Sequence, residues 1–196
     1  MLFFIFCIFV LSTVVLINKV MENIKIKGEI TKEVIDTLIG LMTDVIGEKA
    51  VKIVLDGINV DEGSKGKDIV YAFAESTTNF LSKKASFAIL RQVGRELALA
   101  IMAKHDPSEY DYVLTTTLND LGFAQQILKE DNQAFICNCV FYSILKRNSL
   151  GPIQHSVCWT GWGFIEGFMR ELKGIKGIKW ARRDHENNRC QFDYLT

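Results

Sequence analysis

The sequence lacks an excess of charge of either sign. Lysine and arginine together number 23, and so do aspartate and glutamate, which makes the formal net charge zero. No overall field would therefore hold the chain on nucleic acid or on an anionic membrane surface, and we expect no nucleic-acid partner. The length of 196 residues allows one globular domain with an appendage.

Conventional catalytic motifs are also missing. The sequence has no G-x-S-x-G, no phosphate-binding G-x-x-x-x-G-K, no H-E-x-x-H and no G-x-G-x-x-G that opens a helix after a strand. The histidines, His105, His155 and His185, lie at predicted termini or turns, where a solvated or capping role is commoner than a general base. We therefore predict no catalytic residue and favour a binding protein over an enzyme, while a bound cofactor could still carry chemistry.

A disulfide framework is absent as well. The five cysteines are odd in number and have no framework spacing, which indicates a reducing compartment with free or metal-bound thiols. Cys158 and Cys190 are the most suggestive pair, because a cysteine at a helix start and one in a hairpin could meet in space. His185, Glu186 or His155 could then complete a zinc site, although no C-x-x-C motif supports it.

The N-terminus carries a long apolar run. Residues 1–17, MLFFIFCIFVLSTVVLI, hold no charge and sit at the short end of the ~17 to 25 residues that span a bilayer. The run has neither the basic start nor the small-residue cleavage site of a secretory signal peptide. Positively charged flanks stay on the cytoplasmic side, and lysines follow the run at Lys19, Lys25 and Lys27.

This pattern predicts a membrane anchor over residues 1–20 and a domain over residues 21–196 at the cytoplasmic face of the membrane. The alternative is that Met21 is the true initiator. The first twenty residues would then be an artefact of start assignment, and the protein would be cytoplasmic.

The rest of the chain predicts an α+β fold, with an antiparallel sheet of about four strands packed against several helices and an N-terminal apolar helix. Amphipathic spacing predicts helices over 31–46 and 48–57, and a helical stretch over 68–104 that breaks either at STTN, residues 76–79, or at Ser82. Asp106, Pro107 and Glu109 form a complete N-terminal capping signal for a helix that reaches about Leu121. Period-two patterns predict one hairpin over 123–144 and another over 174–195 that turns at Asp184 to Asn188, on either side of a helix from about His155 to Leu172.

Residues 158–171, CWTGWGFIEGFMRE, combine aromatic side chains with glycines. Gly163 and Gly167 are four residues apart on one helix face and would form a groove that lets a strand, a helix or a flat ligand come close. Tight packing of this helix on the sheet is the simpler interpretation. The two are compatible, because an apolar cavity with few polar groups is typical of a small-molecule site.

The C-terminal half resembles a known family. The resemblance rests on LNDLGFAQQILKEDNQAFICNCVFYSI, HSVCWTGWGFIEGFMRELKG and IKWARRDHENNRCQFDYL, and it covers about Lys83 to Leu195. These stretches resemble the 4-vinyl reductase domain family, also described as predicted hydrocarbon-binding domains. That family shares a ligand-binding fold with subunits of the TRAPP transport particle and, more distantly, with haem nitric-oxide sensor domains. The matching positions are Cys158, Gly163, Gly167, Cys190-Gln191-Phe192 and, in FAILRQVGREL, Gly94.

The resemblance implies helices and a sheet that enclose a lipophilic pocket. Zinc-binding members use the helix cysteine, an acidic residue and two hairpin cysteines. Here Arg182 stands at the first hairpin-cysteine position and Lys179 near the acidic one. Zinc is therefore expected only at an improvised site made of Cys158, Cys190 and His185.

Three functions follow as hypotheses. The first is a sensor or carrier module for a small lipophilic or aromatic ligand. The second is a dimerising scaffold like the transport-particle subunits, and the third is an accessory subunit in reduction of a tetrapyrrole vinyl group. For the first, we predict that the pocket is lined by Phe87, Leu90, Phe135, Cys139, Phe141, Trp159, Trp162 and Phe164, with Gly94, Gly163 and Gly167 as close-packing glycines.

Overall fold

The computed structural model describes residues 29–61, 63–172 and 175–196. The predicted apolar helix and membrane anchor lie outside these residues. Within the described part of the chain, no helix is long and apolar enough to cross a membrane. The elements run in the order α2 (Lys32–Ile46), α3 (Glu48–Asp56), α4 (Gly66–Leu81), α5 (Lys83–Met102), η1 (Pro107–Glu109), α6 (Tyr110–Asp120), β1 (Gln126–Glu130), β2 (Gln133–Cys137), α7 (Tyr142–Arg147), α8 (Val157–Glu171), β3 (Gly177–Asp184) and β4 (Arg189–Leu195).

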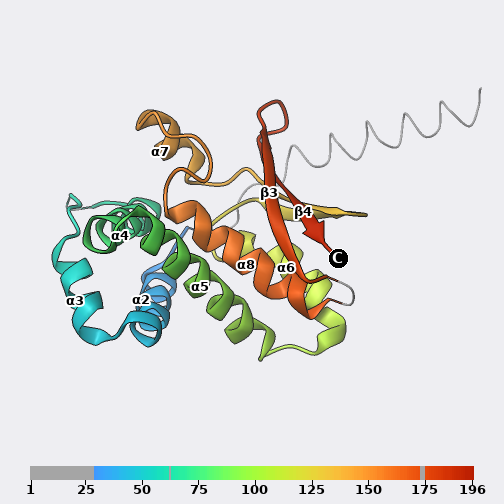
Figure 1. The fold of residues 1–196 in the computed structure, drawn as a ribbon, viewed down its shortest axis with the longest axis horizontal. Coiled ribbons are helices and arrows are strands. Elements are labelled where there is room, and N and C mark those ends of the chain that lie inside the picture. The colour runs from blue at the N-terminus through green and yellow to red at the C-terminus, as the bar shows by residue number, and fades with distance from the viewer. Residues whose placement is uncertain (1–28, 62, 173–174) are drawn as a thin grey trace, which may run out of the picture.

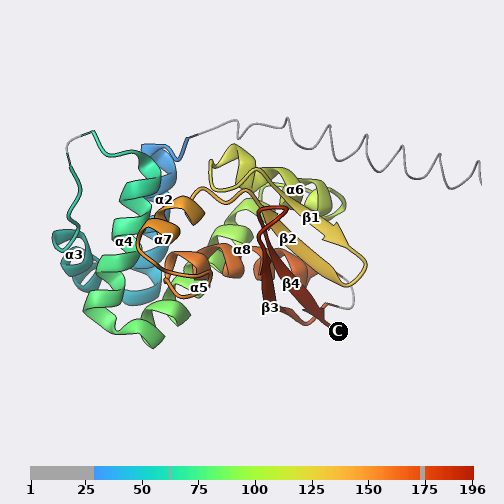
Figure 2. The same cartoon turned by 90° about the horizontal axis from the view of Figure 1, so that it is seen from above.

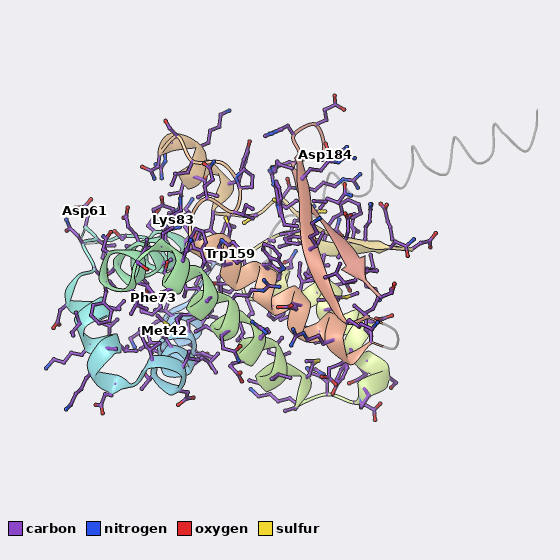
Figure 3. The ribbon with its side chains drawn as sticks, viewed as in Figure 1. Met42, Asp61, Phe73, Lys83, Trp159 and Asp184 are labelled. Atoms are coloured by element: carbon purple, nitrogen blue, oxygen red, sulfur yellow. The ribbon has the colours of Figure 1, made fainter. Side chains whose placement is uncertain are left out.

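The fold is α+β, as the sequence predicts. Helices α2 to α4 gather at one end of the molecule and the sheet lies at the other, with α5 and α8 crossing the middle side by side (Figures 1 and 2). Figure 3 places Met42 and Phe73 within the helical end, Trp159 near the centre and Asp184 at the tip of the β3–β4 hairpin. Met42 is fully buried and Phe73 is 5% exposed, because the apolar stripes of α2 and α4 face each other.

The helix boundaries follow local signals in the sequence. Of the two predicted positions for a break, 76–79 and Ser82, the structure has the break at Ser82, which has a φ of +85° and separates α4 from α5. At the start of η1, Asp106 accepts a hydrogen bond from the Ser108 amide, and the Glu109 carboxylate accepts one from the Asp106 amide. This reciprocal capping satisfies amides that the helix itself leaves unpaired.

The four strands form one antiparallel sheet in the order β1-β2-β4-β3. The pairs Ile136–Cys190 and Trp180–Phe192 lie directly opposite each other in neighbouring strands. Opposed residues of antiparallel strands project from the same face. This face, which we call the inner face, packs against α6 and α8.

The first hairpin is shorter than predicted. The sequence pattern predicts that Phe135, Cys137, Cys139 and Phe141 share one face of a strand, but β2 ends at Cys137. Asn138 follows with a φ of +51°, a left-handed conformation that asparagine tolerates better than most residues. The chain therefore turns, and the segment predicted to continue the strand becomes α7. The turn breaks the strand alternation, which has consequences for the site.

Candidate functional site

An apolar cavity lies between the N-terminal half of α8 and the inner face of the sheet. Its volume is about 70 Å³. Since a water molecule takes up about 30 Å³ in the liquid, the cavity has room for roughly two groups of that size. Nearly all of its walls are hydrocarbon or sulfur. The lining residues are Val70, Leu97, Leu118, Phe123, Ala124, Ile136, Cys139, Phe141, Pro152, Ile153, Val157, Cys158, Thr160, Gly161, Phe164, Trp180, Cys190 and Phe192.

Gly161 forms the part of the α8 wall that faces β2. A Cβ atom added to this glycine would lie 3.5 Å from Ile136 Cδ1, an ordinary van der Waals distance. The glycine thus leaves space that a larger side chain would fill, and the absence of this side chain helps to keep the cavity open.

The segment from Gly151 to Gln154, which we call the strap, covers one side of the cavity. Its residue Ile153 has a φ of +58°, a conformation that a β-branched residue rarely adopts. Such strain costs about 1 to 3 kcal/mol and persists only where the surroundings hold it in place. Here the Trp159 indole N–H donates a hydrogen bond of 3.1 Å to the Ile153 carbonyl. The strained backbone is therefore tied to α8 at the edge of the cavity.

Three thiols border the cavity: Cys139, Cys158 and Cys190. Burial raises the pKa of Cys139 to about 11 and that of Cys158 to about 12. Both thiols are therefore protonated near neutral pH, and a protonated thiol is neither a strong nucleophile nor a metal ligand. Cys190 differs in that its sulfur accepts a hydrogen bond of 3.3 Å from the Arg183 guanidinium. Cys139 and Cys158 thus contribute polarizable apolar surface to the cavity.

The suggested zinc ligands do not come together as a set. Cys158 and Cys190 share the cavity, but His185 is exposed and its Nδ1 lies 3.1 Å from the Tyr142 hydroxyl. Within the residues that the structure describes, no group of three or more histidine, cysteine, aspartate or glutamate side chains is arranged to hold a metal ion. The arrangement of Cys158, Cys190 and His185 therefore gives no support to a zinc site.

The cavity includes only part of the predicted lining. Cys139, Phe141 and Phe164 border it. Phe135 is buried on the opposite face of the sheet, under the Arg189 guanidinium at 4.3 Å, because the turn at Asn138 separates it from Cys139 and Phe141. Four other residues predicted to line the pocket pack between α5 and α8 and do not border the cavity. They are Phe87, Leu90, Trp159 and Trp162.

The two tryptophans of α8 take part in an aromatic stack. Trp159 stacks between Phe87 and Trp162, with ring centroids 4.8 and 4.6 Å apart. The Arg91 guanidinium lies 4.4 Å from the Trp162 ring, at a distance typical of a cation–π contact. These rings therefore stabilise the junction of the two helices.

Gly94, Gly163 and Gly167 all lie at the contact between α5 and α8. A Cβ atom on Gly163 would lie 1.9 Å from the Arg91 carbonyl oxygen, and one on Gly94 would lie 2.0 Å from the Thr160 carbonyl oxygen. On Gly167 it would lie 2.6 Å from the Ala98 methyl carbon. The sequence left open whether a strand, a helix or a flat ligand occupies the glycine groove. In the structure, helix α5 occupies this groove.

Several lining residues were not predicted from the sequence. Trp180 and Phe192 could have been found, because they occupy opposite positions in the second hairpin and share its inner face with Cys190. Ile153 and Pro152 carry no periodic signal, since they belong to an irregular segment. Only the tertiary structure brings the strap to the cavity.

His155, at the base of the strap, is buried rather than solvated. It is 7% exposed, stacks on Tyr71 with ring centroids 4.1 Å apart, and accepts a hydrogen bond at Nδ1 from the Val157 amide. Burial, with a contribution from the charge of Lys83, lowers the pKa of His155 from 6.5 to about 4. The folded protein therefore keeps this imidazole neutral where the unfolded chain would protonate it.

Acidification should destabilise the protein through His155. Between pH 6.5 and pH 4 the unfolded chain binds one proton more at this residue than the folded protein does, so stability present above pH 6.5 is lost as the pH falls. The expected loss is about 2 to 3 kcal/mol over this interval. Urea unfolding of wild type and His155→Phe at several pH values measures it, because the variant should lack this part of the slope. Equal slopes in the two proteins would show that His155 titrates normally.

Comparisons of the chain with family models, with curated proteins and with solved structures find no match.

Proposed function

We propose that this protein is a sensor or carrier module that binds a small lipophilic or aromatic ligand in the cavity beneath α8. The observation that carries the proposal is the apolar cavity itself, which is lined by aromatic, aliphatic and thiol side chains. Burial of apolar ligand surface, at roughly 25 cal/mol per Å², would drive binding there. The family resemblance of the sequence points to the same kind of pocket.

The size of the cavity limits the ligand. Its volume of about 70 Å³ is roughly half that of an engineered apolar cavity of about 150 Å³ that accepts benzene. A ring of that size would have to displace a wall of the cavity. The strap is the wall best suited to move, because movement would relieve the strained backbone of Ile153. The same volume gives no support to a tetrapyrrole ligand.

The scaffold hypothesis receives less support. The apolar stripe of α2 that could have served a dimer buries Leu38 and Met42 within this chain. Exposed apolar side chains remain on the helices, among them Ile53 of α3, Phe80 of α4 and Leu99 of α5. Light scattering tests for a homodimer. The anchor at residues 1–17 stays a prediction; it would hold the cavity close to lipophilic molecules that partition into a membrane.

Filling the cavity should abolish binding without unfolding the protein. Gly161→Leu places a side chain at the cavity wall, whereas Gly40→Leu places the same side chain on the exposed face of α2, where an added Cβ meets no atom within 4 Å. Saturating toluene or hexanol should raise the free energy of unfolding of wild type and of Gly40→Leu by about 1 to 3 kcal/mol. Gly161→Leu should show no such increase.

The measurement is chemical unfolding of the full chain with and without each probe. A wild-type protein that neither probe stabilises would contradict the proposal, as would equal stabilisation of the Gly161→Leu variant. A complementary measurement is mass spectrometry of denatured protein from its native source, which should release a stoichiometric apolar compound.

A further inference from the structure

Arg183 of β3 lies on the same face of the sheet as the cavity because of a β-bulge. Simple alternation from Trp180 would place Arg182, not Arg183, on the inner face. A register irregularity between Trp180 and Arg182 shifts the pairing, so that Arg182 opposes Gln191 and Arg183 opposes Cys190. Since Cys190 borders the cavity, the bulge places Arg183 beside a residue of the cavity wall, although Arg183 itself is not one of the lining residues.

The guanidinium of Arg183 has no carboxylate partner among the described residues. It donates to the Cys190 sulfur and to the Asn188 side-chain oxygen, and it lies 3.9 Å from the Tyr142 ring. Its Nε–H is buried without a hydrogen-bond partner. The nearby Asp184 carboxylate instead pairs with Arg189 at 3.1 Å and accepts hydrogen bonds from the 186–187 turn.

The other partly buried arginines are in a different situation. Arg91 and Arg95 form ion pairs with Glu166, and Arg189 forms ion pairs with Glu130 and Asp184. A buried N–H without an acceptor, such as the Arg183 Nε–H, is costly unless an anion or another acceptor reaches it. Sulfur is a weak acceptor, so the bond to Cys190 compensates little.

Two further observations connect Arg183 with the cavity. Burial dominates the raised pKa values of Cys139 and Cys158, and the Arg183 charge opposes the shift of both, which places this charge near two thiols of the cavity wall. Trp180, which also lines the cavity, likewise has a buried indole N–H without a partner in the described part of the chain. The two unsatisfied donors, the Arg183 Nε–H and the Trp180 indole N–H, therefore lie at successive inner-face positions of β3, beside a cavity that is otherwise apolar.

We propose that the ligand is a small organic acid whose apolar body occupies the cavity and whose carboxylate is bound by Arg183. This inference rests on the proposed binding function and adds the chemical class of the ligand. A carboxylate matches the planar donor fork of a guanidinium and can take two parallel hydrogen bonds, one of them from the unsatisfied Nε–H. The apolar body can be aliphatic or aromatic, and the probes distinguish the two.

The experiment compares acids with alcohols of the same skeleton. Hexanoate and hexanol test an aliphatic body, and benzoate and benzyl alcohol test an aromatic one, each titrated into the full chain by calorimetry at constant ionic strength. Wild type should bind the acid of at least one pair about tenfold or more tightly than the alcohol, a difference of about 1.4 kcal/mol. The pair that shows the preference identifies the body.

Arg183→Gln should remove the preference for the acid and leave the affinity for the alcohol within about twofold. Arg182→Gln is the matched control, because it removes the same charge one residue away, where Arg182 hydrogen-bonds Gln191 on the opposite face of the sheet. This control should keep the preference. If Arg183→Gln does not fold, Arg183→Lys replaces it in the test. Lysine keeps the charge but loses the planar donor fork, so this variant should retain only part of the preference for the acid.

Equal affinity of wild type for acid and alcohol would overturn this inference and leave the proposed function standing. An unchanged acid preference in Arg183→Gln would also overturn it. Absence of binding for all four probes, together with no stabilisation by toluene, would overturn both.

Discussion

Replacing Gly163 with alanine should destabilise the fold by about 3 kcal/mol. The added methyl group would lie 1.9 Å from the Arg91 carbonyl oxygen, which is backbone of a neighbouring helix and cannot rotate away. The axes of α5 and α8 would have to separate, and the aromatic stack between the helices would loosen with them. The gain of about 1 kcal/mol from replacing glycine inside a helix would not offset this loss.

Gly161→Ala is the matched control, two residues earlier on the same helix. Its methyl group would meet only the Ile136 side chain at 3.5 Å, so the change should be neutral or stabilise the protein by up to about 1 kcal/mol. Urea unfolding followed by circular dichroism measures both variants. Similar stabilities for the two would show that α5 and α8 are not packed backbone against backbone.

Replacing Glu166 with glutamine should cost about 3 kcal/mol or more. The Glu166 side chain is only 4% exposed and accepts hydrogen bonds from Arg91 of 2.8 and 2.9 Å. Arg95 and Arg170 form further ion pairs with the same carboxylate, each at 3.4 Å. Without this negative charge, three guanidinium groups remain close together around a neutral amide, two of them mostly removed from solvent.

Glu171→Gln removes the same charge five residues later on α8, at an exposed position. Its effect should stay within about 0.5 kcal/mol. Thermal and chemical unfolding of both variants test the expectation. A loss below about 1 kcal/mol for Glu166→Gln would indicate that solvent screens the cluster and that the buried carboxylate is not what joins α5 to α8.

The cavity shows which lining residues a local sequence pattern predicts and which it does not. Cys139, Phe141 and Phe164 were predicted to line the cavity and do border it, although the strand that grouped Cys139 and Phe141 with Phe135 ends at Cys137. Phe135 could not be excluded from it, since strict alternation puts Phe135 on the same face as Cys139 and nothing in the apolar pattern announces that Asn138 ends the strand. Trp159 and Trp162 are as consistent with a ligand pocket as with a helix junction, because both environments bury aromatic rings.

The face of the sheet on which Arg183 lies is a second feature that the local sequence pattern does not predict. In the sequence, Arg182 and Arg183 are adjacent cations in one predicted strand, and period two alone assigns the inner face to Arg182. The bulge between Trp180 and Arg182 reverses this assignment. Such an irregularity depends on how two strands align with each other, which the pattern of one strand does not encode.

The amino-acid sequence by itself determined the class of the fold, the places where most helices begin and end, and the turn of the second hairpin. These features depend on neighbours a few residues apart: capping side chains, glycines and apolar periodicity. Only the tertiary structure decided which glycines pack helix on helix, which aromatic rings line the cavity and which arginine shares the inner face of the sheet with Cys190. Those outcomes depend on contacts between residues far apart in the chain, where one turn at Asn138 or one bulge in β3 exchanges the two faces of a strand.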